Sequence, residues 1–331
     1  MTKRENVRAA IGHRQPERMP YLINLTLEGH KIYDRRLIER YADAKILKDL
    51  KYGRINEMEA ASLAIGNCVH SFSPPWWNWR DVPAEYRLSH EPPYYLPNTV
   101  GVGNYEAFFE HLNYISENYD AYILISIYGC HFEKAQACRG FENFMADIGG
   151  EPGYVKKLLK KIIDKNLVMI DNIAASPEID GILLGSDWGS QASLLMSLDD
   201  WDDLIAPGEQ AEFDLIKEHG KDVWIHSCGN IAPLLPRLVD MGMQVLNPVQ
   251  PECMDIFELK DRFGGDITFW GGISTQRTLP YGTPDDVRRE TETLIARLGK
   301  GGGLITAPSQ EIQVDVPFEN LIALIEAARN G

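Results

Sequence analysis

Short apolar runs that alternate with longer amphipathic stretches constrain the fold of this chain most, and the alternation is clearest after residue 120. Strands are predicted at 121–126, 181–185, 223–225, 244–246, 267–270 and 303–306. Helices are predicted at 142–145, at 152–176, within 199–220 with a break at Pro207-Gly208, and at 232–241, 255–263 and 285–298. Strict alternation of this kind indicates parallel strands joined by helical crossovers.

Among parallel α/β folds, the sequence favours a closed barrel over an open doubly wound sheet. No glycine-rich dinucleotide or nucleotide loop follows an early strand, and the strand–helix units outnumber those of a small open sheet. The glycine cluster 299–303 precedes a strand, so it is a helix stop and turn. We therefore predict one (β/α)8 TIM barrel domain over residues 1–331, with an N-terminal helical extension and an aromatic and proline-rich lid inserted at 67–99.

Charge and cysteine content narrow the functional classes. A formal net charge of −15 argues against nucleic-acid binding, which needs a basic face, and no polybasic segment or long apolar run suggests a membrane partner. The N-terminal residues lack an apolar signal core, so we expect a cytoplasmic protein. Five scattered cysteines do not form a disulfide framework.

The sequence His226-Ser227-Cys228-Gly229 stands where the apolar strand 223–225 reaches a glycine turn. In a strand, residues two apart point to the same side, so the imidazole of His226 and the thiol of Cys228 can reach one ion. Nitrogen and sulfur ligands suit Zn²⁺. The pair therefore predicts a zinc site at a strand end.

Other polar residues also follow predicted strands, at the end where barrels place their active sites. Asp187 follows strand 181–185, Asn247 and Gln250 follow strand 244–246, and Gln310 and Glu311 follow strand 303–306. This convergence predicts an enzyme. Each residue also has a structural alternative, since Asp187 could cap a turn and Asn247 could satisfy backbone groups in its loop.

Several of these segments resemble the uroporphyrinogen decarboxylase superfamily, and specifically its methyltransferase-like branch. The motifs span residues from about 120 to the C-terminus in family order: 185–191 (GSDWGSQ), 226–231 (HSCGNI), 246–251 (LNPVQP), 269–276 (FWGGISTQ) and 317–320 (PFEN). The resemblance implies a (β/α)8 barrel with its site at the carboxyl-terminal mouth. Porphyrinogen decarboxylases of the family carry an arginine-rich N-terminal signature, whereas residues 20–29 here read PYLINLTLEG.

Zinc methyltransferases of this superfamily move a methyl group between a corrinoid protein and a thiol or folate, and they bind zinc through His-x-Cys and a distant cysteine. His226 and Cys228 match the first two ligands, and the third position falls near Gln310. Because no cysteine follows Cys253, Gln310 or Glu311 substitutes, Cys253 supplies the third ligand, or the site is vacant. In this interpretation Asp187 orients or deprotonates the acceptor, and Asn247 holds a polar head group of the substrate.

Two other functions stay open. A metal-free tetrapyrrole decarboxylase would need arginines to hold carboxylates, with candidates Arg35, Arg36, Arg80, Arg87 and Arg139. A non-catalytic corrinoid or tetrapyrrole binder would use the Trp-rich insertion. Cys130 and His131 also follow a strand, but adjacent strand positions point to opposite faces, which predicts a weak nucleophile–base pair. The resemblance also allows a homodimer.

Overall fold

The computed structural model describes residues 1–75 and 104–331, and these form two compact units. Unit 1 comprises Met1–His70, Ser116–Tyr122 and Val245–Gly331. Unit 2 comprises Ser71–Ile115 and Ile123–Gln244. The predicted alternation of strands and helices is present in both units, and the prediction of one domain over the whole chain stays a prediction.

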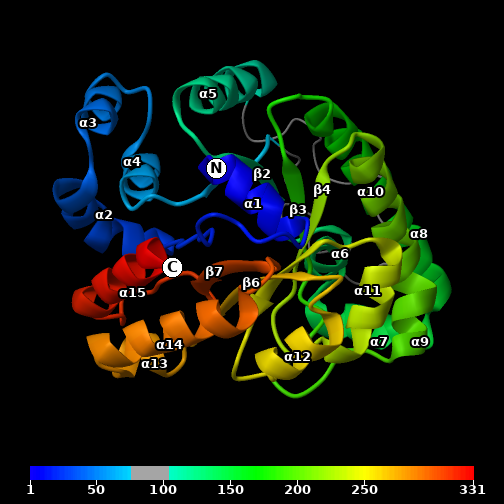
Figure 1. Cartoon of the computed structure of the whole chain (residues 1–331). Helices are drawn as coiled ribbons and strands as arrows, with labels where there is room; N and C mark the ends of the chain where they lie inside the picture. Colours follow the sequence, from blue (N-terminus) through cyan, green and yellow to red (C-terminus); the bar gives the residue numbers. More distant parts are fainter. Residues whose placement is uncertain (76–103) are drawn as a thin grey trace. The chain divides into compact units, whose positions relative to one another are not determined.

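Unit 2 is built on a parallel sheet of β2 (Tyr122–Ile127), β3 (Gly181–Gly185) and β4 (Asp222–His226) (Figure 1). Nearly every strand residue is buried, as expected of strands covered on both faces. The register pairs Gly185 with His226, so β3 and β4 end at the same level. The helices of this unit include α6 (His131–Arg139), α7 (Phe141–Gly150), α8 (Pro152–Ala174), α9 (Leu198–Asp200), α10 (Ala206–Glu218) and α11 (Leu235–Met241).

The predicted break at Pro207-Gly208 is wrong. α9 passes through a π-helical turn, Trp201–Ile205, directly into α10, and the N–H of Ala206 donates to the carbonyl of Trp201. Pro207 has no N–H to donate within this continuous helix, and the wider π-helical turn directly precedes it. The start of the helix predicted at 232–241 is instead a 3₁₀ turn, Ala232–Leu234, that leads into α11.

Unit 1 contains the parallel strands β5 (Val245–Val249), β6 (Thr268–Ile273) and β7 (Leu304–Pro308). Between and after these strands lie α12 (Ile256–Phe263), α13 (Thr278–Tyr281), α14 (Pro284–Leu298) and α15 (Phe318–Asn330), and α14 packs beside α15 (Figure 1). β6 runs three residues beyond its predicted end. Gly271 makes this extension possible, since a Cβ there would lie 2.7 Å from the backbone nitrogen of Val249 in β5.

An extended segment near the N-terminus runs beside β7, which the sequence analysis did not predict. Isolated parallel bridges join Tyr21 to Thr306 and Leu25 to Ile312. The N–H of Leu22 donates to the carbonyl of Thr306 at 3.0 Å, and the N–H of Thr306 donates to the carbonyl of Pro20 at 2.9 Å. This segment therefore adds a short strand-like element to the strands of unit 1.

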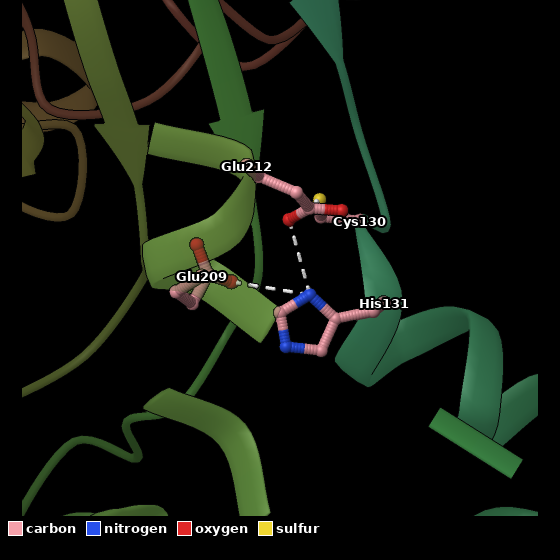
Figure 2. Close-up of side chains that lie close together, drawn as sticks. All are labelled: Cys130, His131, Glu209 and Glu212. Atoms are coloured by element: carbon pink, nitrogen blue, oxygen red, sulfur yellow. Dashed lines mark hydrogen bonds and ion pairs between the residues drawn. The ribbon is translucent and has the colours of Figure 1, made fainter. Parts of the chain in front are cut away.

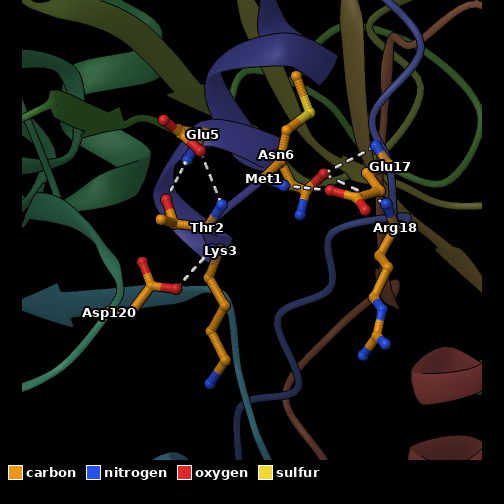
Figure 3. Close-up of polar contacts among 8 residues, drawn as sticks. All are labelled: Met1, Thr2, Lys3, Glu5, Asn6, Glu17, Arg18 and Asp120. Carbon is orange, nitrogen blue, oxygen red and sulfur yellow. Dashed lines mark hydrogen bonds and ion pairs between the residues drawn. The ribbon is translucent and has the colours of Figure 1, made fainter.

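The predicted N-terminal helical extension is present as α1 (Lys3–Ile11), α2 (Leu27–Tyr41), α3 (Ala44–Lys51) and α4 (Glu57–Ala64). Figure 3 shows how α1 begins: Thr2 and Glu5 form a capping box, and Asp120 accepts the N–H of Lys3 at 2.6 Å. Asn6 accepts the N–H groups of Glu17 and Arg18 at 2.9 and 3.2 Å (Figure 3). These contacts anchor the helix, because they satisfy N–H groups at its first turn and in the loop that follows it.

The segment predicted as a lid begins differently from the prediction, because its first residues form β1 (Val69–Phe72). Its proline- and tryptophan-rich part lies outside the described residues, which resume before α5 (Tyr105–Asn118). None of the five cysteines, all of which lie in the described residues, forms a disulfide. Within residues 1–75 and 104–331, no helix has both the length and the apolar character needed to cross a membrane.

Candidate metal centre at the ends of β3 and β4

Asp187, His226 and Cys228, here called the strand-end cluster, lie together in unit 2, and one ligand atom of each lies within 4.8 Å of the others. The thiol of Cys228 is 3.5 Å from His226 Nε2, and Nε2 is 3.5 Å from Asp187 Oδ1. The His226 side chain is 11% exposed and that of Asp187 is 41% exposed. The imidazole of His226 is therefore largely buried in the protein, whereas the carboxylate of Asp187 is open to solvent.

The sheet register brings these residues together. Gly185 and His226 are paired at the ends of β3 and β4, and the N–H of Ser186 donates to the His226 carbonyl at 2.9 Å. Asp187 comes two residues after Gly185, and its Oδ1 accepts the N–H of Cys228 at 2.9 Å. One carboxylate thus fixes the turn that carries the thiol.

Two glycines allow the loops that follow β3 and β4 to pack against each other. A Cβ on Gly189 would lie 2.6 Å from the carbonyl oxygen of Cys228. Gly229 has a φ of +83°, and a Cβ there would lie 2.5 Å from the carbonyl oxygen of Ser190. Larger residues would push the loops apart, so both glycines keep Asp187 near Cys228.

Residues outside the cluster hold its scaffold in place. The Ser227 hydroxyl accepts the backbone N–H of Trp188 at 3.1 Å, and the Trp188 ring packs edge-on against Trp201 of the π-helical turn at 5.6 Å. The ring of Tyr128 meets His226 edge-on at 5.3 Å. These contacts restrict the orientations open to the imidazole.

Glu133, on α6, was not singled out by the sequence analysis. Burial and the negative charge of Asp187 raise the pKa of Glu133 to about 7, although hydrogen bonds from the backbone of Asp187 and Gly129 partly offset this rise. No short motif links residues 133 and 187. The only sequence signal is that both follow predicted strands.

The other predicted site residues belong to unit 1. Asn247 is buried within β5 rather than in a loop after it, and its Nδ2 donates to the carbonyl of Trp270 in β6 at 3.2 Å. Gln310 is half-buried, and its Oε1 accepts the N–H of Glu311 at 3.1 Å. Cys253 is half-buried, and its thiol donates to Gln250 Oε1 at 3.7 Å. The roles of Gln310, Glu311 or Cys253 as a third metal ligand stay predictions.

A groove of about 1010 Å³ also lies in unit 1. It is lined by Cys253, by residues 251–257 around it and by one side of α14, including Arg289 and Glu290. The groove includes no residue of the strand-end cluster. We therefore keep it apart from the candidate metal centre.

The strand-end cluster fits a zinc ion by its chemistry and spacing. Zinc binds imidazole nitrogen, thiolate sulfur and carboxylate oxygen at about 2.0–2.3 Å, so tetrahedral ligand atoms lie about 3.4 Å from one another. The two 3.5 Å separations match this value. Three protein ligands leave a fourth position open, which is typical of catalytic zinc sites rather than structural ones.

The prediction for Cys130 and His131 is wrong in its geometry. The two residues stand at the start of α6 rather than within a strand, and both side chains reach one buried group with Glu209 and Glu212 of α10 (Figure 2). At a helix start, neighbouring side chains do not alternate between two faces as they do in a strand.

Comparison with known proteins gives a consistent result. A family model described as uroporphyrinogen decarboxylase (URO-D) matches residues 95–331. No curated protein matches the sequence significantly. Among solved structures, a methyltransferase from Methanosarcina mazei matches with a TM-score of 0.71 and 16% identity, covering 100% of this chain and 99% of that one. This similarity supports the predicted TIM-barrel-like α/β fold.

An α-galactosidase from Saccharomyces cerevisiae, solved with raffinose, matches more weakly, with a TM-score of 0.39 and 9% identity. It covers 98% of this chain and 66% of the yeast chain.

Proposed function

The chain belongs to the uroporphyrinogen decarboxylase family, and we propose that it is a zinc-dependent methyltransferase. Its proposed reaction moves a methyl group between a corrinoid, or a methylated small molecule, and a thiol or similar acceptor. The observation that carries the proposal is the strand-end cluster, in which nitrogen, sulfur and oxygen donors meet with one side open.

In this proposal, His226 and Cys228 hold the zinc ion, and Asp187 is the third ligand in place of a distant cysteine. When bound, zinc acts as a Lewis acid that lowers the pKa of an acceptor thiol or hydroxyl at the open position. Cys228 would contribute a thiolate, and Asp187 would fix its backbone through the 2.9 Å hydrogen bond. The exposed edge of Asp187 would be the side from which an acceptor approaches.

Tyr128 and Glu133 would complete the surroundings of the acceptor. Tyr128 is 42% exposed and packs edge-on against His226, so it offers an aromatic wall beside the metal ligands. Glu133 places a second carboxyl beside Asp187. The corrinoid would come as a partner-borne group or a free methyl donor, because methyl transfer to an activated thiol needs a separate methyl carrier.

The first test measures zinc in the purified protein and in the variants His226→Ala and Cys228→Ala. We expect about one zinc per chain at the strand-end cluster and its loss in both variants, because each removes a ligand. Transfer of the methyl group from methylcobalamin to a small thiol should disappear in the same variants. Zinc is measured by mass spectrometry, and transfer by the absorbance change of the corrinoid.

Matched controls separate loss of a ligand from general damage. His219→Ala removes a histidine that pairs with Asp171 at 2.8 Å, and Cys68→Ala removes a cysteine in the other unit. Both should retain zinc and transfer. The proposal fails if His226→Ala and Cys228→Ala keep the zinc content and methyl transfer of the wild type.

Tetrapyrrole decarboxylation is less well supported by the arginines it would require. Arg35 pairs with Glu39 at 2.9 Å on an exposed helix face, and Arg36 lies over the ring of Phe318 at 3.5 Å. Arg139 forms a 2.6 Å ion pair with Asp147. The other two candidate arginines, at positions 80 and 87, lie outside the described residues. Each described arginine thus already has a partner within its own unit.

A further inference from the structure

Unit 2 holds a second group of metal-binding side chains that the proposed reaction does not use. Cys130, His131, Glu209 and Glu212, here called the buried cluster, each offer one ligand atom within 4.8 Å of the others, and all four side chains are fully buried (Figure 2). We propose that this cluster binds a second, structural zinc ion that the chain takes up as it folds. This inference is independent of the proposed methyl transfer.

Glu209 gives the strongest indication that the buried cluster binds a cation. It is 0% exposed, and within the described part of the chain neither of its carboxyl oxygens has a hydrogen-bond partner. Its Oε1 lies 3.5 Å from His131 Nδ1, toward the centre of the cluster (Figure 2). Burying a polar group without a partner costs about 1–3 kcal/mol, and more for a charged one. A cation between these residues would remove that cost.

Two other side chains of the buried cluster, those of Cys130 and His131, already contact Glu212. Its Oε2 accepts the thiol hydrogen of Cys130 at 3.0 Å and lies 3.2 Å from His131 Nδ1. Its other oxygen accepts Asn166 Nδ2 at 2.8 Å. Sulfur, nitrogen and two carboxylate oxygens make a four-ligand set suited to zinc, and a closed set of this kind is typical of structural sites.

The charges around the cluster balance for a doubly charged cation. One thiolate and two carboxylates carry three negative charges, so a Zn²⁺ complex with them retains one negative charge. Lys134 is fully buried nearby, and its Nζ donates to Asn166 Oδ1 at 2.7 Å, which links it through Asn166 to Glu212. The lysine offsets the remaining charge, which a buried site requires.

The backbone is also shaped to bring α10 close to His131. Gly208 lies just before Glu209, and a Cβ at this position would lie 3.2 Å from His131 Cε1 and 2.4 Å from Ile163 Cδ1. A larger residue would push the imidazole away from the carboxylates. The π-helical turn Trp201–Ile205 directly precedes α10, and such turns often occur at functional sites.

Full burial predicts how the two sites exchange metal. Ligands with no exposed surface release an ion only when the surrounding helices open, whereas the strand-end cluster faces solvent. A chelator added to the native wild type should therefore remove about one zinc per chain, from the strand-end cluster, and leave about one in place. The second zinc ion, held by the buried cluster, should be released to the chelator only when a denaturant is added.

The decisive experiment uses the His226→Ala/Cys228→Ala double variant, which lacks the strand-end ligands. Refolded with zinc or cobalt, it should hold about one metal ion per chain, and cobalt should show a thiolate charge-transfer band. Adding Cys130→Ala should abolish the band and the metal. Cys138→Ala, a buried cysteine on the same helix, should leave both unchanged.

Glu209→Gln is a second variant that keeps the side-chain shape if Cys130→Ala fails to fold. It should also lose the metal, since an amide is a much weaker ligand than a carboxylate. The inference is overturned if the double variant folds, as judged by circular dichroism, but takes up neither zinc nor cobalt. It is equally overturned if the cobalt band is unchanged by Cys130→Ala.

Discussion

Asp187 has two contacts that a neutral side chain could only partly replace. Its Oδ1 accepts the Cys228 N–H at 2.9 Å and lies 3.5 Å from His226 Nε2. An asparagine in its place could keep the first contact through its amide oxygen but would offer no negative charge to a metal ion. The substitution therefore separates the scaffold role of this residue from its proposed role as a metal ligand.

We expect Asp187→Asn to weaken zinc binding by about 10–100-fold while the free energy of unfolding without metal stays nearly unchanged. Competition with a coloured chelator measures the affinity, and urea unfolding measures the stability. Asp261→Asn, which changes an exposed carboxylate on α12, is the matched control. Equal zinc affinity in the wild type and in Asp187→Asn would show that Asp187 only caps its turn.

His13 makes the stability of the protein sensitive to acid. Burial lowers the pKa of His13 below its ordinary value of 6.5, and the positive charge of Lys260 lowers it further. The folded protein therefore binds a proton at His13 less readily than the unfolded chain does. Stability is retained above pH 6.5 and is lost as the pH falls through 6.5 toward the lowered value.

His13→Asn should remove this contribution without disturbing the backbone, because His13 has a φ of +49° and asparagine tolerates that conformation. In urea titrations at several pH values, the wild type should lose more stability than the variant on acidification below pH 6.5. Parallel pH profiles for the two proteins would contradict this expectation.

At the scale of elements, the loops that follow β3 and β4 depend on glycine. Gly229 and Gly220 both have positive φ, at +83° and +70°. A Cβ on Gly229 would lie 2.5 Å from the Ser190 carbonyl oxygen, whereas nothing lies within 4 Å of the corresponding position at Gly220. The two sites therefore differ in steric contact and share the backbone strain.

Gly220→Ala should cost about 1 kcal/mol through backbone conformation alone. Gly229→Ala should cost about 2–4 kcal/mol, because the loops must also separate, and it should reduce zinc content at the strand-end cluster. Denaturant unfolding gives the two free energies. Equal costs would mean that the loops yield without strain.

The pattern of elements was predictable because it follows local periodicity. The strands at 181–185 and 223–225 were located from apolar runs, and the same two-residue period predicted that His226 and Cys228 share a side. The continuous helix from α9 to α10 was not predicted, because Pro207-Gly208 normally signals a break. There, tertiary packing of buried Trp201 and Phe213 outweighs the local signal.

Contacts between distant helices explain what the sequence did not reveal. Glu209 and Glu212 lie about 80 residues beyond Cys130, and only the packing of α6, α8 and α10 within unit 2 brings them together. Glu133 approaches Asp187 in the same way. Local patterns carry no information about such pairs, so these carboxylates appeared to be ordinary helix residues.

At the scale of the whole molecule, the fold was more predictable than the reaction. The chain shares 16% of its residues with the Methanosarcina methyltransferase and still matches it over its full length, because buried strands tolerate exchange among apolar residues. Ligands at strand ends have no such tolerance, since one residue decides whether a metal binds. The chain has no cysteine after Cys253, and the structure places the carboxylate of Asp187 beside His226 and Cys228.

The π-helical turn Trp201–Ile205 has a consequence for which lengths of this segment a related chain can have. A π-helical turn holds one residue more than an α-helical turn, so a chain with one residue fewer here would form a regular α-helix, and the residues after it would keep nearly the same orientation. Removing one residue from the α-helical start of α10 would instead rotate everything after it by about 100° about the helix axis. Glu209 and Glu212 would then leave the interior together. A related chain that keeps the four buried residues can therefore lose one residue from the π-helical turn, but it cannot lose one between Ala206 and Glu209.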